Sequence, residues 1–319
     1  MTEFEGVLKI QEKFGINPIY SRVVFSLARK ENLIEDATKI IAERPKPFVK
    51  WVGGKRQLLK QFKELGLYPP DGFDPIKHTY YEPFVGGGAV FLDLLPKKAV
   101  LSDLNIELIT TYKVIKNDVT KLIKLLKSYK YDKDFYTKVR SKNIKDLSDI
   151  QIAARFIYLN RTCFNGLYRV NRKGEFNVPM GEYTNPLICD EENLNKISKA
   201  LKNVKIYNED YKKVLKRAKK GDFIYFDPPY YPVNKTSNFT NYTTQDFLEK
   251  EQAELRNTFF ELHKRGCFVM LSNSDTPFIN KLYSNLDKKI KVNKVLAGRN
   301  VNSDAKKRGK IKEVLVINY

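Results

Sequence analysis

An acidic residue and two prolines follow a short apolar run in the second half of the chain. Residues 223–226 are apolar throughout, and Asp227-Pro228-Pro229-Tyr230 comes directly after them. Proline has no N–H donor, so carbonyls in such a loop stay open to an outside donor. Asp227 and a proline carbonyl could accept the two N–H groups of an exocyclic amine while Tyr230 stacks on its ring. A strand-ending turn would use the same residues, so both interpretations stay open.

A glycine turn forms a second candidate site. The segment 80–91 has the pattern of a strand, a turn at Gly86, Gly87 and Gly88, and then a helix. Glycines let the backbone approach a ligand closely and adopt positive φ, and the first turn of a helix offers free N–H groups. A purely structural turn would have the same composition.

Two more carboxylates close apolar runs. Asp103 follows the first of these runs. Its distance from the glycine turn is about that at which nucleotide-binding folds place a ribose-binding acid, so it could accept both ribose hydroxyls. Asp210 ends the segment 204–210 and could accept an adenine amino group. Either residue alone could instead cap a helix. Three strand-end carboxylates beside a glycine turn are harder to explain in that way.

These residues need a sheet to bring them together. From residue 48 onward, short apolar runs alternate with longer lysine-rich amphipathic segments, which predicts an α/β sheet with helices on both faces. In such sheets, ligands bind at the carboxyl ends of the strands. We expect strands around 100–101, 206–207, 223–226, 268–271 and 314–317.

The chain divides into three predicted parts. Residues 1–44 precede Pro45-Lys46-Pro47, which opposes a continuing helix, so we predict an N-terminal helical extension, either an appendage or an oligomer contact. The stretch 112–200 interrupts the alternation and is rich in Arg, Lys, Asn and Tyr, as expected of an inserted recognition domain. Residues 45–111 and 201–319 then form the main domain.

Composition points to a polyanionic partner. The 319 residues include 58 Lys and Arg against 37 Asp and Glu, a net charge of +21, which favours nucleic acid, although surface lysines can also serve solubility. Three unpaired cysteines and two histidines argue for a reducing cytoplasm and against a disulfide framework or a metal site. No apolar run approaches the roughly 18 residues of a membrane span, so we expect no membrane association.

The ordered motifs resemble the Dam-type, alpha-class DNA adenine N6-methyltransferases, including methylases of GATC restriction-modification systems. The resemblance covers about residues 47–319 and leaves residues 1–44 without a counterpart. It rests on PFVKWVGGKR (47–56), EPFVGGG (82–88), NRTCFNGLYR (160–169), GEFNVP (174–179) and DPPY (227–230).

The resemblance implies a Rossmann-like S-adenosylmethionine-dependent methyltransferase sheet with an inserted helical target-recognition domain. Asp227 and the Pro228 carbonyl would accept both N–H groups of a flipped adenine, which frees the nitrogen lone pair for attack, and no metal is needed. The implied catalytic residues are Asp227, Pro228, Pro229 and Tyr230. The implied cofactor-binding residues are Trp51, Lys55, Glu82, Phe84, Gly86, Gly87, Gly88, Asp103 and Asp210.

The same resemblance predicts double-stranded DNA with a GATC target and, as a possible partner, a restriction endonuclease acting on the same site. Phe164 and Asn165 would form a wedge beside the flipped base, Arg169 would read guanine, and Arg161 would contact phosphate. Apart from the resemblance, the basic segment 299–312 lies between two apolar strand signals, so it could be a hairpin loop that clamps the DNA backbone or a solvated loop. The implied DNA-binding residues are Lys50, Arg161, Phe164, Asn165, Leu167, Arg169 and Pro179.

Two other functions stay open at this point. An N-methyltransferase acting on RNA or on a protein glutamine would share the fold, but many of those relatives carry Asn where this chain has Asp227. A DNA-binding module without catalysis is opposed by the intact Asp227, Tyr230 and glycine turn, because function has to be argued from the site.

Overall fold

The computed structural model describes residues 44–51, 53–171, 173–233, 247–298 and 310–319. Apart from Arg44, the predicted helical extension 1–44 lies outside these residues. Most of the predicted basic loop, residues 299–309, also lies outside them. Within the described residues, no helix is both long and apolar enough to cross a membrane.

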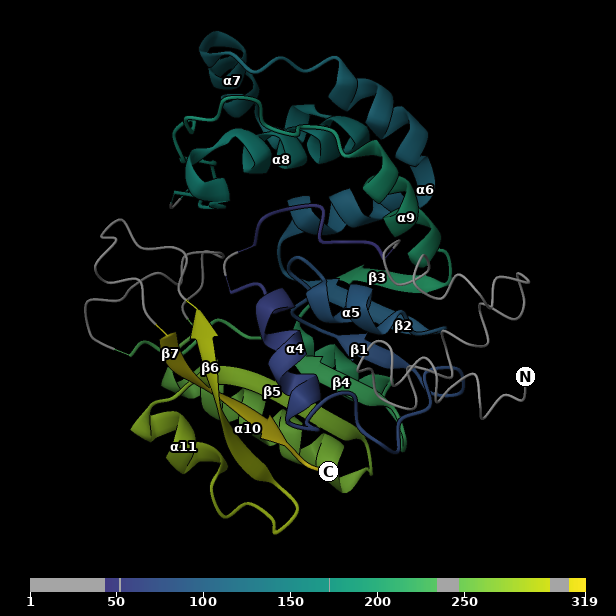
Figure 1. Ribbon diagram of the computed structural model, residues 1–319, viewed down its shortest axis with the longest axis vertical. Coiled ribbons are helices and arrows are strands. Elements are labelled where there is room, and N and C mark those ends of the chain that lie inside the picture. The colour runs from purple at the N-terminus through teal and green to yellow at the C-terminus, as the bar shows by residue number, and fades with distance from the viewer. Residues whose placement is uncertain (1–43, 52, 172, 234–246, 299–309) are drawn as a thin grey trace.

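The described strands form one seven-stranded sheet in the order β3-β2-β1-β4-β5-β7-β6 (Figure 1). The five strands from β3 to β5 run parallel, and β7 pairs antiparallel with both β5 and β6. All five predicted strands are present. The bounds are β1 Tyr80–Glu82, β2 Ala99–Asp103, β3 Val204–Asn208, β4 Phe223–Phe226, β5 Phe268–Ser274, β6 Lys291–Gly298 and β7 Lys310–Ile317.

Five of the described α-helices, α6 to α9 and α11, begin at polar caps that satisfy free backbone N–H groups. Asn105 accepts from the N–H of Leu108, and Ser148 and Gln151 form a capping box. The helices are α4 Arg56–Glu64, α5 Ala89–Leu94, α6 Ile106–Lys127, α7 Lys133–Arg140, α8 Asp149–Thr162, α9 Glu191–Ala200, α10 Glu249–Lys264 and α11 Pro277–Tyr283. Three 3₁₀ turns, η2 Ile144–Asp146, η3 Phe164–Gly166 and η4 Tyr211–Lys216, complete the helical elements described.

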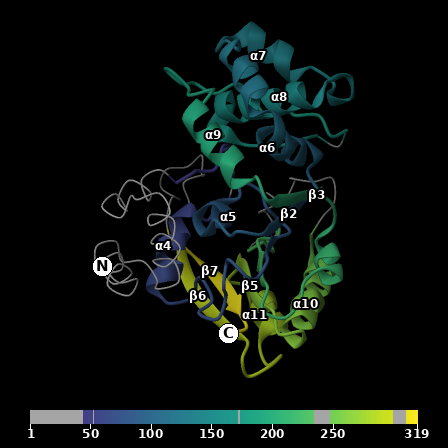
Figure 2. The same ribbon diagram turned by 90° about the vertical axis from the view of Figure 1, so that its right-hand side faces the viewer.

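Alternate residues of each strand enter two different cores. Tyr225 packs with the helices α4, α5 and α6, whereas Ile224 and Phe226 pack with η4, α10 and α11. Side chains alternate across a strand with a period of two, so a strand that is apolar throughout must be covered on both faces. Figure 2 shows α4 and α10 on opposite sides of the strands. The predicted α/β sheet with helices on both faces is confirmed.

Helix α6 joins the sheet to a group of helices above it. It begins directly after β2 and packs against α8 and α9, which lie with α7 at the top of Figure 1. The helix continues through residue 112, the predicted start of the inserted domain, and bends at Asp118 (φ −136°, ψ 33°). The predicted boundary therefore falls inside a helix that belongs to both parts.

The sheet order brings three predicted acids to one edge. Glu82 ends β1, Asp103 ends β2, and Asp227 follows β4. Because β1 lies between β2 and β4 and all three run parallel, their carboxyl ends meet at the same edge of the sheet. This is the edge at which open α/β sheets bind ligands.

Candidate active site

Asp227 forms an ion pair with a buried lysine. Its Oδ1 lies 2.7 Å from Lys55 Nζ, and the side chains are 23% and 3% exposed, respectively. Lys55 also donates to the Gly53 carbonyl at 2.5 Å and lies 4.9 Å from the centre of the Tyr230 ring. Burial raises the pKa of the Asp227 carboxyl, and the Lys55 ammonium offsets part of that rise. Lys55, predicted to bind cofactor, therefore lies at the 227–230 loop.

The rest of this loop is held by residues that the sequence did not reveal. The Tyr230 hydroxyl donates to Glu313 Oε2 at 2.8 Å, and Gln252 Nε2 donates to the Pro229 carbonyl at 3.0 Å. Burial raises the pKa of Tyr230 well above its ordinary value, so the hydroxyl remains a donor. Glu313 lies on β7 and Gln252 on α10, so no local pattern connects either of them to the loop.

Glu82 is enclosed at the end of β1. Its Oε2 accepts from the Tyr80 hydroxyl at 2.9 Å and from the N–H of Phe91 at 3.0 Å. Burial raises the pKa of this carboxyl to about 8, with the nearby Asp227 adding to the rise. A buried carboxyl of this kind gains from a cationic partner, such as the ammonium group of an amino acid.

The glycine turn passes close to aromatic side chains. Gly86 has φ 45°, and a Cβ there would lie 2.6 Å from Trp51 Nε1; at Gly88, with φ 66°, a Cβ would lie 2.6 Å from the Tyr112 hydroxyl. Gly87 also lies against Trp51. The turn thus needs glycine for its conformation and for space, and no side chain of its own blocks a ligand.

Asp103 is oriented by the same turn. Its Oδ2 accepts from the N–H of Gly86 at 3.2 Å and its Oδ1 from that of Asn105 at 3.0 Å. Burial raises the pKa of Asp103 against the effect of these bonds. Each carboxylate oxygen keeps a second lone pair, which suits the paired hydroxyls of a ribose.

Two apolar side chains flank this carboxylate and were not predicted. Leu104 and Ile106 are 47% and 49% exposed, although both are large and apolar. Exposed apolar residues directly after a strand-end acid suit the face of a flat ring. That position was the one signal by which the sequence could have revealed them.

Asp210 lies two residues beyond the end of β3 and caps η4. Its Oδ1 accepts from the N–H of Lys212 at 2.8 Å, so the helix-cap alternative holds for this residue, and its other oxygen can still accept a ligand donor. The next residue, Tyr211, stacks on Phe84 with ring centres 5.3 Å apart and an interplanar angle of 27°. The ends of β1 and β3 are therefore in contact through Phe84.

The predicted wedge residues form a turn at the end of α8. Phe164 and Asn165 are exposed in η3, and Asn165 takes φ 54°, which asparagine tolerates. The N–H of Phe164 donates to the Pro179 carbonyl at 2.9 Å, so two residues far apart in sequence lie together. Leu167 follows this turn and is half-buried.

Arg169 is exposed on a short hairpin. A bridge pairs Val170 with Phe176, and the N–H of Asn177 donates to the Arg169 carbonyl at 3.1 Å. The Arg169 guanidinium donates through Nε to Asn177 Oδ1 at 2.8 Å. Its Nη2 also lies 3.5 Å from the Asn177 carbonyl, so Asn177 orients the guanidinium from one side.

Lys50 and Arg161 both join the segment before α4 to α8. Lys50 exchanges backbone bonds of 2.7 and 2.8 Å with the Asn160 amide, and its exposed Nζ lies 4.7 Å from the centre of the Tyr183 ring. Arg161 Nε donates to the Phe48 carbonyl at 3.1 Å, and burial lowers the pKa of its guanidinium. These contacts give Arg161 a structural role, and its predicted phosphate contact stays a prediction.

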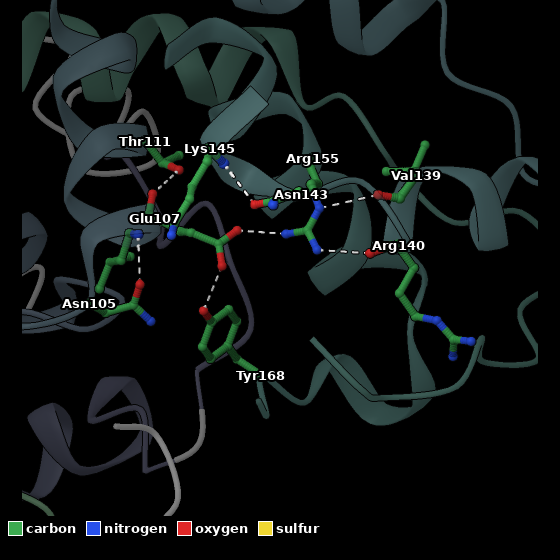
Figure 3. Close-up of polar contacts among 10 residues, drawn as sticks. Asn105, Glu107, Thr111, Val139, Arg140, Asn143, Lys145, Arg155 and Tyr168 are labelled. Atoms are coloured by element: carbon green, nitrogen blue, oxygen red, sulfur yellow. Dashed lines mark hydrogen bonds and ion pairs between the residues drawn. The ribbon is translucent and has the colours of Figure 1, made fainter. Parts of the chain in front are cut away.

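A buried polar cluster connects this region to the sheet (Figure 3). Glu107, in the first turn of α6, binds Arg155 Nη1 through Oε2 at 2.7 Å and accepts from the Tyr168 hydroxyl through Oε1 at 2.9 Å. Arg155 also donates to the carbonyls of Val139 and Arg140 at 3.2 and 3.0 Å. Tyr168 lies between the half-buried Leu167 and the exposed Arg169, so the cluster fixes the base of the hairpin.

Comparison with known proteins identifies the family. The model of the D12 class N6 adenine-specific DNA methyltransferases matches residues 51–297. The chain belongs to this family. It is an enzyme that uses S-adenosylmethionine to methylate N6 of adenine in DNA.

Similar proteins support the assignment, and they include type II methyltransferases and a DNA adenine methylase. The type II methyltransferase M.MjaIII of Methanocaldococcus jannaschii is 47% identical over 293 residues, which cover 86% of this chain and 99% of that protein. The type II methyltransferase M1.LlaDCHI of Lactococcus lactis is 44% identical, covering 86% of this chain and 95% of its own length. The DNA adenine methylase of Escherichia coli K12 is 33% identical, with 86% and 96% covered.

Proposed function

We propose that this D12 class enzyme methylates adenine within GATC and that residues 227–230 form its catalytic loop. The observation that carries the proposal is the placement of Asp227. Its carboxylate follows β4 at the ligand-binding edge of the sheet, with Lys55 Nζ at 2.7 Å and the Tyr230 ring beside that lysine. An acidic acceptor and an aromatic surface therefore lie together, as the target amine and its ring require.

The loop residues would activate the adenine amine as acceptors. Its lone pair is delocalised into the ring, so the nitrogen becomes a nucleophile only as it turns tetrahedral. Asp227 Oδ and the Pro228 carbonyl favour that geometry by accepting the two N–H groups. Lys55 keeps Asp227 ionised despite burial, because its ammonium opposes the rise in the Asp227 pKa. The methyl group would leave the sulfonium sulfur, which becomes a neutral thioether, as the N–C bond forms, and Asp227 would accept the amine proton that has to leave.

The cofactor residues would each hold one part of S-adenosylmethionine, which supplies an electrophilic sulfonium methyl group. Glu82 suits the ammonium end, and Asp103 suits the ribose hydroxyls through its open lone pairs. Gly86, Gly87 and Gly88 let the backbone approach the methionine portion. Asp210 can accept from the adenine amine, beside the Phe84 ring.

The insertion 112–200 would recognise the target. Supporting this, the exposed Phe164 and Asn165 lie at the end of α8, while Arg169 is exposed on the hairpin, where Asn177 holds its guanidinium. An arginine can bond guanine O6 and N7 together, worth about 1–3 kcal/mol of discrimination. Arg169→Ala should therefore lose selectivity against a site with the guanine replaced. Lys173→Ala, at an exposed position of the same hairpin, is the matched control and should keep it.

A label-transfer assay tests the whole proposal. The protein is incubated with labelled S-adenosylmethionine and two duplexes that differ only in one GATC site. We expect label in the GATC duplex alone and none with Asp227→Ala. Equal labelling of both duplexes would refute the target sequence, and an active Asp227→Ala would refute the catalytic loop.

A restriction endonuclease acting on the same site is the proposed biological partner, and we place both with the DNA in the cytoplasm. The type II names of the two relatives at 47% and 44% identity support this role. DNA treated with the enzyme should resist an endonuclease that cuts unmethylated GATC. If such an endonuclease cuts the fully methylated DNA as readily as untreated DNA, the proposed partnership is refuted.

A further inference from the structure

Two buried side-chain amides, on Gln252 and Asn273, hydrogen-bond to each other and to the backbone of the proposed catalytic loop. Gln252 Nε2 donates to the Pro229 carbonyl at 3.0 Å, and Asn273 Nδ2 donates to Gln252 Oε1 at 2.9 Å. Asn273 Oδ1 in turn accepts from the N–H of Tyr231 at 3.1 Å. Gln252 on α10 and Asn273 on β5 are both 0% exposed. This row of hydrogen bonds thus connects the Pro229 carbonyl to the N–H of Tyr231.

The direction of every bond in this row is determined. Asn273 Oδ1 also accepts from the N–H of Ser274 at 2.9 Å, so two backbone donors fix it as the acceptor side. Asn273 Nδ2 must then face Gln252 Oε1, and Gln252 Nε2 must face the Pro229 carbonyl. Reversing either amide would set donor against donor or acceptor against acceptor in a dry interior, at about 1–3 kcal/mol for each unsatisfied group.

The loop needs such outside support because of its own sequence. Pro228 and Pro229 have no N–H, so neither can anchor the backbone as a donor. The proline ring also fixes φ at Pro229, which leaves the peptide carrying the Pro228 carbonyl little freedom once the Pro229 carbonyl is held. Ser274 Oγ donates to the Tyr231 carbonyl at 2.6 Å and secures the exit of the loop.

We propose that Gln252 and Asn273 are positioning residues for methyl transfer. By holding the Pro229 carbonyl and the Tyr231 N–H, they direct the Pro228 carbonyl and the Asp227 carboxylate toward the target amine. The inference rests on the proposed catalytic role of residues 227–230. Neither side chain reaches the substrate; both act through the loop.

Isosteric substitutions test the direction of the bonds. Gln252→Glu and Asn273→Asp keep the volume but replace a donor with an acceptor. Because a misplacement of about 1 Å can cost about 100-fold in rate, we expect single-turnover methylation to slow by about 10- to 100-fold at saturating DNA and cofactor. Dissociation constants for DNA and for a non-reactive cofactor analogue should change by less than about threefold, since positioning affects the rate and not the binding.

Asn318→Asp provides a matched control. Asn318 is also a buried amide, 7% exposed, and it accepts from the N–H of Val269 at 2.7 Å and donates to the Cys267 carbonyl at 2.9 Å. These contacts lie at the start of β5, whereas Asn273 lies near its end. The control should lower the melting temperature and leave the single-turnover rate unchanged.

The outcomes separate positioning from stability. Gln252→Met, which buries no charge, takes the place of Gln252→Glu should that variant not fold. Rates within twofold of wild type, an equal rate loss in Asn318→Asp, or a loss confined to binding would each overturn the inference. Asp227→Ala is measured in the same assay. If it is active, the catalytic loop itself is wrong; if it is inactive while Gln252→Glu is fully active, only the positioning role fails.

Discussion

At the scale of single residues, the candidate site depends on charges placed where water is scarce. Lys55, Asp227 and Glu82 influence one another, as the causes of the raised pKa values of Asp227 and Glu82 show. In the proposed function, Asp227 has to remain an acceptor, whereas Glu82 binds the cationic end of the cofactor. Their environments keep these tasks apart, because Asp227 has a lysine at 2.7 Å and Glu82 has a tyrosine and a backbone N–H.

Removing the lysine should change how the reaction depends on pH. In Lys55→Met, the Asp227 pKa rises further because the ammonium that opposed the effect of burial is gone. A larger share of Asp227 is then protonated at neutral pH, and a protonated carboxyl is a poorer acceptor. We expect the acid limb of the single-turnover pH profile to move to higher pH, with partial recovery in alkaline buffer.

The control is Lys63→Met on α4, the helix that begins directly after Lys55. Lys63 also forms an ion pair, with Asp93 at 2.7 Å. Its removal should leave the pH profile in place. If the acid limb of Lys55→Met is unchanged or moves to lower pH, Lys55 does not lower the Asp227 pKa as assigned.

The raised pKa of Glu82 predicts how the stability of the cofactor-free protein depends on pH. Its folded-state pKa of about 8 lies above the ordinary value of 4.5, so the fold favours the protonated form. The stability from this group is present below the ordinary pKa and is lost as pH rises through about 8. In Glu82→Gln, which cannot ionise, this loss disappears, so its melting temperature relative to wild type should rise across that window. A constant difference between pH 4 and 9 would show that Glu82 ionises normally.

At the scale of elements, the Glu107, Arg155 and Tyr168 cluster joins α6, α8 and the base of the hairpin that carries Arg169 (Figure 3). Glu107 and Arg155 are 4% exposed at the side chain. Glu107→Gln should cost about 3–5 kcal/mol of unfolding free energy, because it leaves Arg155 as an uncompensated buried charge. The triple variant Glu107→Leu, Arg155→Met, Tyr168→Phe removes the buried ion pair and the tyrosine hydroxyl together, so no buried charge stays unpaired, and it should cost less than Glu107→Gln. Urea denaturation measures both, and a triple variant that is the less stable would contradict this account.

The elements also show which features the sequence could predict. Residues 223–226 and 268–271 are apolar throughout because β4 and β5 are covered on both faces, and the sequence revealed them readily. Strand β6 lies at the edge of the sheet, and its sequence KVNKVLAG has no long apolar run, so its bounds were not predicted and it was expected only as one of two strands flanking the basic segment. Asp103 was found because it stands at a strand end, whereas Glu82 was named only through the family resemblance. Asp210 was predicted to close β3 and instead caps the following turn.

The remaining site residues could not be found from local pattern. Gln252 is a single amide on the buried side of α10, and Glu313 is one acid on β7. Each reaches the 227–230 loop only because of the sheet order, which places β5 beside β4 and β7 beside β5. Their partners lie 23 and 83 positions away in sequence. Such pairings follow from topology, which single-sequence patterns do not specify.

At the scale of the whole molecule, a net charge of +21 governs association with DNA. Affinity for any duplex should fall as salt rises, with a slope of about 0.9 for each phosphate neutralised. Replacing Lys306, Lys307 and Arg308 with Gln, in a segment outside the described residues, should weaken binding to GATC and unrelated DNA alike and flatten that slope. Binding titrations at several salt concentrations check this. Unchanged affinity and slope would assign the segment to a solvated loop.

The position of Trp51 makes it an intrinsic fluorescence probe of ligand binding. It is the only tryptophan in the chain, its indole lies against Gly86 in the glycine turn, and its ring stacks on Tyr168 with centres 5.8 Å apart. Intrinsic fluorescence excited selectively at tryptophan therefore reports from one known place between the cofactor residues and the hairpin. We expect a non-reactive cofactor analogue and a GATC duplex each to change the emission, which would let both binding steps be timed by stopped flow without any attached dye.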